Sequence, residues 1–166
     1  MNFHPSDDRR MLADSLDRYV AEQYGIETRH RISQSAAGYS AEQWSQFAEL
    51  GIIAALFTEA QGGLGGTGFD IATVFESLGR GLVVEPFLAS AVLAGSALTH
   101  VGTPTQQALV DEIMAGRLIA TLAHEEAHSH HELHRVSTRA TRDGDHYVID
   151  GVKAVVPFGA QAAQII

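Results

Sequence analysis

The sequence predicts an α+β chain: an all-helical N-terminal domain over residues 1–116, followed by the beginning of an antiparallel β-domain over residues 117–166. Two observations support this division. Up to Gly116, apolar residues recur every three or four positions between capping residues and glycines, which is typical of amphipathic helices. After it, a short apolar run precedes the pairs Asp143-Gly144 and Asp150-Gly151, which favour hairpin turns between strands.

The composition narrows the class of protein. The chain has 166 residues, of which 45% are hydrophobic and 19% are charged, enough apolar surface for a globular core. A net charge of −9 argues against nucleic acid or an anionic membrane as a partner. The absence of cysteine excludes disulfides and thiolate metal sites, and the polar N-terminus does not match a secretory signal. We expect a cytoplasmic location.

The first helices are predicted from their caps and stripes. Ser6 is a capping residue, and the helix that follows should end near Gly25. A second, short helix is predicted over residues 27–33. Ser40 and Gln43 have capping-box spacing for a third helix, which Gly51 should end. The apolar stripes of the first and third helices consist of Leu12, Leu16, Tyr19, Val20, Trp44, Phe47 and Ala48.

A glycine cluster follows an apolar run over residues 52–57. Gly63, Gly65 and Gly68 fit the dinucleotide fingerprint GxGxxG, in which glycines let the backbone approach a pyrophosphate. No βαβ unit surrounds the cluster, and no Lys-Ser or Lys-Thr follows it. We therefore expect a connection between helices here and not a nucleotide site.

Three further helical segments complete the first domain. A helix is predicted from Phe69 to about residue 79, in which Glu76 is either a buried carboxylate or, as we favour, a solvent-facing charge. Residues 86–102 contain no Asp, Glu, Lys or Arg and are too few to span a bilayer, so they predict a core helix that is apolar on every side. Thr103, Pro104 and Gln106 begin a last helix that Gly116 should end.

Five segments in this order resemble the acyl-CoA dehydrogenase family, from its N-terminal helical domain into its middle β-domain. They read QGGLGG, SLGRGLVVEPFLAS, GTPTQQALVDEIMAG, LAHEE and GDHYVIDGVK. The segments SLGRGLVVEPFL and VIDGVKAVV are similar to the small-subunit type of heteromeric dehydrogenases that act on dicarboxylic or steroid-derived acyl-CoA thioesters. The resemblance covers nearly the whole chain, and its specificity comes from the joint order of the segments.

The resemblance implies an FAD-dependent oxidoreductase of fatty acid or steroid side-chain catabolism. In the family, a carboxylate removes the α-proton of an acyl-CoA, a hydride passes to the flavin, and electrons then pass to an electron-transferring flavoprotein. The protein positions the substrate, polarises the thioester carbonyl and excludes water, while the flavin supplies the redox chemistry.

Two segments correspond to the flavin contacts of the family. Cofactor-binding positions are implied at Leu122, Ala123 and His124, and at Val155, Val156 and Pro157. In the family, a threonine contacts the flavin at the place of His124, and another at the place of Pro157, so this chain lacks both hydroxyls. Pro157 also has no backbone N–H. A substrate contact near the CoA chain is implied at His130.

The catalytic glutamate of the family has no match in these residues, so the catalytic residue is unknown. The expectation is a fragment of a longer acyl-CoA dehydrogenase, or a subunit that forms an oligomer with similar chains. The first alternative is a noncatalytic structural subunit of a heteromeric acyl-CoA dehydrogenase.

A second alternative comes from the histidine-rich stretch. His124-Glu125-Glu126-Ala127-His128 matches HExxH, the zinc hydrolase pattern in which two histidines one helical turn apart bind the metal. The chemistry requires a helix, whereas the preceding residues 118–123 predict a strand. We therefore expect a solvated polar loop without a metal.

Overall fold

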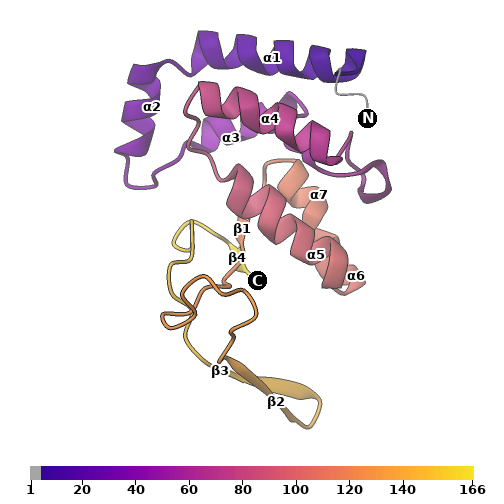
Figure 1. Cartoon of the computed structure of the whole chain (residues 1–166), viewed down its shortest axis with the longest axis vertical. Coiled ribbons are helices and arrows are strands. Elements are labelled where there is room, and N and C mark those ends of the chain that lie inside the picture. Colours follow the sequence, from indigo (N-terminus) through magenta and orange to yellow (C-terminus); the bar gives the residue numbers. More distant parts are fainter. Residues whose placement is uncertain (1–4) are drawn as a thin grey trace.

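The computed structural model describes residues 5–166 and places the helices together, with the irregular C-terminal part and its hairpin extending from one side (Figure 1). Residues 1–4, the start of the polar N-terminus that does not match a secretory signal, lie outside the described residues. The helices are α1 (Asp7–Gln23), α2 (Ile26–Ser33), α3 (Ala41–Glu49), η1 (Ala54–Leu56), η2 (Glu59–Gln61), α4 (Gly68–Arg80), η3 (Phe87–Ala94), α5 (Gly95–Val101), α6 (Pro104–Gln107) and α7 (Leu109–Met114). The strands are β1 (Ala120–Thr121), β2 (Arg139–Asp143), β3 (His146–Asp150) and β4 (Gln164–Ile165). The α+β class is confirmed.

The predicted helix starts are confirmed by side-chain caps. The Ser6 hydroxyl accepts from the backbone N–H of Arg9 at 3.3 Å, which satisfies one of the free donors at the start of α1. Thr103 and Gln106 cap each other reciprocally at α6. The last predicted helix is nevertheless divided, because the chain turns at Ala108 between α6 and α7.

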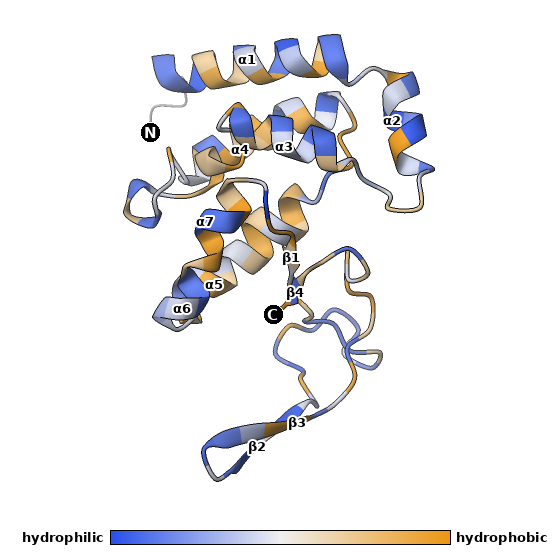
Figure 2. Cartoon of the chain, turned by 180° about the vertical axis from the view of Figure 1, so that it is seen from behind, coloured by the Kyte–Doolittle hydropathy of each residue, from blue (hydrophilic) through white to orange (hydrophobic). Residues whose placement is uncertain are grey.

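Aromatic side chains form the centre of the core. Trp44 and Phe47 of α3 both meet Phe87 of η3 edge-on, with ring centroids 5.1 and 5.2 Å apart, an arrangement that aromatic rings prefer. Leu16 of α1 and Ile113 of α7 are fully buried in the same cluster. The apolar colouring in Figure 2 is dense on α5 and α7, whereas the hairpin is mainly hydrophilic. Within residues 5–166, no helix is long and apolar enough to cross a membrane.

The helix predicted over residues 86–102 differs from expectation in two ways. Its first half, η3, is a π-helix, and only α5 is α-helical. It is also not buried on every side, since Leu88, Leu93 and Val101 are 55%, 41% and 82% exposed. Only one face packs on the rest of the core, so the prediction of a fully buried helix was wrong.

The C-terminal part contains one of the two predicted hairpins. β2 and β3 pair antiparallel, with Arg139 opposite Asp150, around a turn in which Gly144 has φ 61°. The next strand after Asp150-Gly151, β4, pairs with β1 and not with β3, so the second predicted hairpin turn was wrong. The chain after Gly151 instead returns to the loop behind β1, where the backbone N–H of Ala154 donates to the Glu125 carbonyl at 2.8 Å.

The first strand also pairs differently from the prediction. β1 pairs in parallel with β4, with Ala120 opposite Gln164, and not with the antiparallel hairpin. Each strand has only two residues. The pairing brings the end of the described chain beside the exit of the helical part.

Candidate functional site

The two predicted cofactor segments lie side by side. The Thr121 hydroxyl donates to the Pro157 carbonyl at 2.6 Å, and the Lys153 ammonium donates to the His124 carbonyl at 3.1 Å. Because β1 is fixed to η3 by a hydrogen bond from the Ala120 N–H to the Ser90 hydroxyl at 3.1 Å, both segments sit directly beside the helical core. The fold therefore gathers residues 122–124 and 155–157 into one region.

A buried carboxylate that was not predicted as a site residue holds this region together. The Glu126 carboxylate accepts from the backbone N–H groups of Ser137 and Thr138 at 2.7 and 3.0 Å. It also accepts from the Thr138 hydroxyl at 2.6 Å and from the Lys153 ammonium at 2.9 Å. The hydrogen bond from the Thr138 hydroxyl, followed by those from the Ser137 N–H and Lys153, holds the pKa of Glu126 well below its usual range. A glutamate in a histidine-rich loop gives no sequence signal for this role, since its donors are distant in sequence.

The HExxH pattern does not form a metal site. Residues 124–128 are not helical, and the two histidine rings have separate partners. His124 Nε2 lies 3.0 Å from the Leu133 carbonyl oxygen, and His128 Nε2 lies 2.5 Å from the Ser137 hydroxyl. Within residues 5–166, no group of three His, Cys, Asp or Glu side chains could hold a metal ion. The zinc hydrolase alternative therefore has no geometric support.

Two further residues named from the sequence, His130 and Glu76, are exposed to solvent. His130, the predicted substrate contact, is exposed on a turn with φ 49°. Glu76 is exposed and pairs with Arg80, as favoured from the sequence.

The glycine cluster is filled by its own chain. A Cβ on Gly63 would lie 2.2 Å from the Phe57 carbonyl oxygen, and the N–H groups of Gly65 and Gly66 already donate to the carbonyls of Phe57 and Ala55. These donors are therefore unavailable to a phosphate. The geometry supports the expected connection between helices.

An apolar cavity adjoins the second cofactor segment. Its volume is about 180 Å³. It is lined by Glu85, Pro86, Leu88, Ala89, Leu93, Pro157 and Phe158. The π-helical winding of η3 places Leu88 and Leu93, five residues apart, on the same cavity, and π-helical segments are frequent at functional sites. Sequence periodicity assumes 3.6 residues per turn, so it gave no signal for this pairing.

A buried polar network adjoins this cavity through Glu85, one of its lining residues. The Glu85 carboxylate accepts from the Tyr24 hydroxyl at 2.7 Å and from the Ser40 N–H at 3.2 Å. The Tyr24 oxygen in turn accepts from the Val84 N–H at 3.1 Å. Burial raises the pKa of both Glu85 and Tyr24 above their usual values. The network ties α1, the start of α3 and the start of η3 together.

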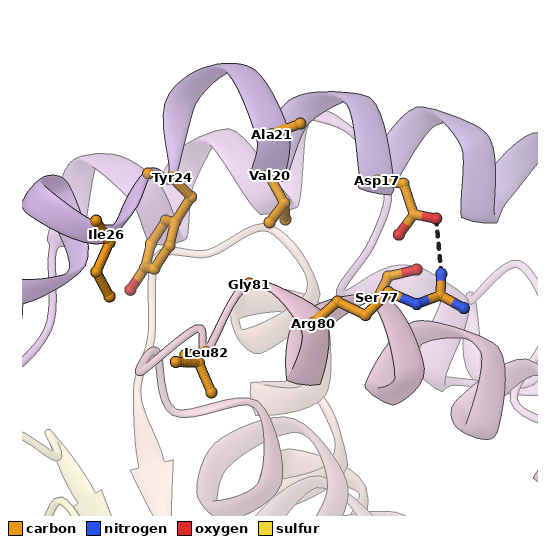
Figure 3. Close-up of a pocket in the computed structure, with 10 residues that line it drawn as sticks. Asp17, Val20, Ala21, Tyr24, Ile26, Ser77, Arg80, Gly81 and Leu82 are labelled. Atoms are coloured by element: carbon orange, nitrogen blue, oxygen red, sulfur yellow. Dashed lines mark hydrogen bonds and ion pairs between the residues drawn. The ribbon is translucent and has the colours of Figure 1, made fainter.

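A larger hollow of about 480 Å³ lies between α1, the start of α2 and the end of α4. Figure 3 shows Tyr24, Ile26 and Leu82 around it, with Asp17 and Arg80 paired at one side. The paired oxygen and nitrogen are 2.9 Å apart. None of the predicted site residues lines this hollow, so we do not assign the site to it.

The residues beside β1 include backbone hydrogen-bond donors of the kind that a flavin ring would need. Within residues 5–166, the backbone N–H groups of His124, Val155 and Val156 make no hydrogen bond, so they could donate to ring nitrogens or carbonyls. The imidazole Nδ1 of His124 is buried and has no hydrogen-bond partner within the described chain, so it is covered by protein and not open to a ring. The Thr121 hydroxyl is already occupied by Pro157.

Comparison with known proteins gives the family. The model of the acyl-CoA dehydrogenase N-terminal domain matches residues 6–117. This chain belongs to the acyl-CoA dehydrogenase family. It is 34% identical over 119 residues to the acyl-CoA dehydrogenase IpdE2 of Mycobacterium tuberculosis, a match that covers 71% of this chain and 37% of that protein. It is 24% identical over 169 residues to the probable acyl-CoA dehydrogenase YngJ of Bacillus subtilis, a match that covers 100% of this chain and 44% of the relative.

Solved structures agree on the fold. The ChsE4-ChsE5 complex from Mycobacterium tuberculosis matches with a TM-score of 0.85 and 25% identity, covering 99% of this chain and 44% of the matched chain. An acyl-CoA dehydrogenase from Mycobacterium smegmatis matches with a TM-score of 0.79 and 28% identity, covering 98% of this chain and 43% of that one. The 166 residues thus span less than half the length of each of these matched chains.

Proposed function

We propose that this chain is part of an FAD-dependent acyl-CoA dehydrogenase, acting in the cytoplasm as a fragment of a longer protein or as a subunit with a partner chain. The observation that carries the proposal is the juxtaposition of residues 122–124 and 155–157 beside an apolar cavity, in a chain of this family. Such a place offers polar contacts to a flavin and an apolar wall to an acyl tail.

The residues have distinct roles in this proposal. The loop behind β1 and the segment that includes Val155 hold the cofactor, partly through backbone N–H groups. The cavity formed by Leu88, Leu93 and Phe158 takes the acyl tail, and His130 lies near the CoA moiety. When bound, FAD would supply the acceptor for the hydride that leaves the acyl β-carbon. The carboxylate that takes the α-proton comes from outside these 166 residues, and an electron-transferring flavoprotein receives the electrons.

The test is acyl-CoA-dependent bleaching of flavin absorbance. The chain is expressed with a full-length acyl-CoA dehydrogenase chain from the same organism, and the purified complex is mixed anaerobically with a panel of aliphatic and steroid-derived acyl-CoA thioesters. Bleaching by one thioester that is weakened by Leu93→Trp, which fills the cavity, supports the proposal. Bleaching that Leu93→Trp leaves unchanged would place the acyl group elsewhere.

One observation favours the second candidate, a noncatalytic structural subunit. His124 and Pro157, which have no hydroxyl, occupy the two places where the family has threonine. Val155, in the second of these segments, is 83% exposed. Its φ of 51° is rare for a β-branched residue. The ChsE4-ChsE5 match is a complex by name, and we propose the same kind of assembly here. A stable complex in which all the flavin is bound by the partner chain would favour this candidate.

A further inference from the structure

The outer edge of β3 is open to another strand. Within residues 5–166, β3 pairs only with β2, in a two-stranded sheet, and no loop is hydrogen-bonded to the backbone of residues 146–150. Every residue of both strands is exposed, and the hairpin extends away from the helices (Figure 1). The described part of the chain therefore leaves this edge uncovered.

The hairpin geometry determines which backbone groups point outward. The turn has two residues, between the paired Asp143 and His146, and the residues that flank such a turn exchange both hydrogen bonds. Bonded and non-bonded pairs then alternate along an antiparallel ladder. The even-numbered residues of β3 therefore bond to β2, whereas the N–H and C=O groups of Tyr147 and Ile149 point to the open edge.

The sequence of β3, HYVID, is complementary to itself. When two copies are laid antiparallel and centred on Val148, Tyr147 lies opposite Ile149 of the second copy, and His146 lies opposite Asp150. Aromatic residues opposite β-branched ones, and basic residues opposite acidic ones, are favourable cross-strand pairs. The outward-pointing residues face each other in this register, so each pair of Tyr147 with Ile149 can exchange both backbone hydrogen bonds.

The opposite edge of the hairpin, on β2, is less suited to such pairing. β2 reads RATRD, and its outward-pointing residues are Ala140 and Arg142, which lie opposite Ile149 and Tyr147. A charged side chain at an edge discourages edge-to-edge pairing, and alanine is depleted in strands. The complementarity therefore selects the edge of β3.

We propose that two copies of this chain associate through the open edges of their β3 strands, antiparallel and centred on Val148. The two hairpins then form one continuous sheet across a two-fold axis, the commonest symmetry of homodimers. Each strand has only five residues, so the interface is small and the dimer is weak. The pairing uses backbone groups and side chains of the hairpin alone and does not depend on the flavin site.

Cysteine cross-linking tests the register directly, because the chain has no cysteine of its own. In a non-hydrogen-bonded pair the two Cα atoms are about 4.5 Å apart, within the range of a disulfide. Val148→Cys should therefore form a disulfide-linked dimer of the full chain under mild oxidation. Thr141→Cys is the matched control, since Thr141 is exposed and lies opposite Val148 on β2. We expect Val148→Cys to cross-link about tenfold faster or more, because only the paired edge holds two cysteines within bonding distance.

Proline at an outward-pointing position tests the hydrogen bonds. Proline has no N–H, and an edge strand tolerates it where that N–H faces solvent. In the Val148→Cys chain, Ile149→Pro removes an outward donor from β3, and Ala140→Pro removes the donor directly opposite on β2. One backbone hydrogen bond corresponds to about a tenfold change in affinity. We therefore expect cross-linking to fall by about tenfold or more with Ile149→Pro and to be unchanged with Ala140→Pro.

Each other outcome overturns the proposal in a distinct way. Equal cross-linking of Val148→Cys and Thr141→Cys would show random collision. Faster cross-linking of Thr141→Cys would assign the interface to β2, and no cross-linking of either would leave the edge of β3 to a different chain. A loss with Ala140→Pro as large as that with Ile149→Pro would contradict the assignment of the outward-pointing groups. None of these results bears on flavin binding, so the proposed function is tested separately.

Discussion

Two buried glutamates have opposite electrostatic surroundings. Glu126 receives four hydrogen bonds from donors that include an ammonium group, and its pKa is lowered. Glu85 lies among apolar side chains with neutral donors, and burial raises its pKa. The first carboxylate is therefore held ionised as a junction between segments, whereas the second favours its proton.

Removal of the Glu126 carboxylate should loosen the loop that it organises. Glu126→Ala leaves the N–H groups of Ser137 and Thr138 without an acceptor, so we expect their amide hydrogen exchange to quicken by about tenfold or more. Exchange measured by NMR at pH 7 reports both amides directly. Glu132→Ala, at an exposed glutamate of the same loop, should leave their exchange unchanged. Unchanged protection of both amides in Glu126→Ala would show that Glu126 does not hold this junction.

The shifted pKa of Glu85 should make stability depend on pH. Because its pKa is raised in the folded chain above the ordinary value of 4.5, the stabilisation is fully present below that value and is lost as the pH rises through the folded pKa. Glu85→Gln cannot titrate, so its unfolding midpoint in urea should fall less than that of the wild type between pH 4 and pH 8. Glu76→Gln, at an exposed position, serves as the control. A pH profile of Glu85→Gln identical to the wild type would contradict the assignment.

At the scale of elements, the glycine loop is shaped by its own packing. Gly63→Ala places a Cβ 2.2 Å from a backbone oxygen, so we expect a loss of about 1–3 kcal/mol or more in the free energy of unfolding. Gly68→Ala is the matched variant from the same GxGxxG pattern: it meets nothing within 4 Å and begins α4, so it should be neutral or stabilising by up to about 1 kcal/mol. Urea denaturation of both variants tests the difference. Equal effects of the two substitutions would contradict this account.

The elements that could be predicted are those set by local interactions. Ser6, Ser40 and Thr103 cap the helices expected of them, and Gly116 ends the last one with φ 71°, because capping depends on neighbours three or four residues away. The parallel pairing of β1 with β4 joins residues far apart in sequence, and the π-helical winding of η3 departs from the 3.6-residue period, so turn pairs and periodicity gave the wrong result there.

The candidate site could be predicted only in part, because some of its contacts join residues that are far apart in the sequence. The resemblance placed residues 122–124 and 155–157 in one site, and the structure brings them together. The contacts of Glu126 could not be read from residue type, because its donors Ser137, Thr138 and Lys153 are more than ten residues away.

At the scale of the molecule, apolar side chains are unevenly covered. The C-terminal part exposes Tyr147, Ile149, Val152 and Val155. Tyr147 and Ile149 share one face of the hairpin, because they are two residues apart on β3. Exposed apolar surface of this kind favours association with another chain.

We therefore expect Ile149→Lys to reduce association measured by size-exclusion chromatography with light scattering, both of the chain with itself and with an acyl-CoA dehydrogenase partner. Val101→Lys introduces the same charge at an exposed apolar site on α5 and should have little effect. An equal loss of association in the two variants would show that charge, and not the hairpin face, controls assembly.

The most direct test of the central claim is the visible spectrum of the purified chain after incubation with excess FAD and desalting. We expect a retained flavin band that decreases in Lys153→Met, because Lys153 holds the His124 carbonyl and Glu126 in place, and that persists in Gly68→Ala. A colourless protein, alone and in complex with its partner, would contradict a flavin site formed by residues 122–124 and 155–157.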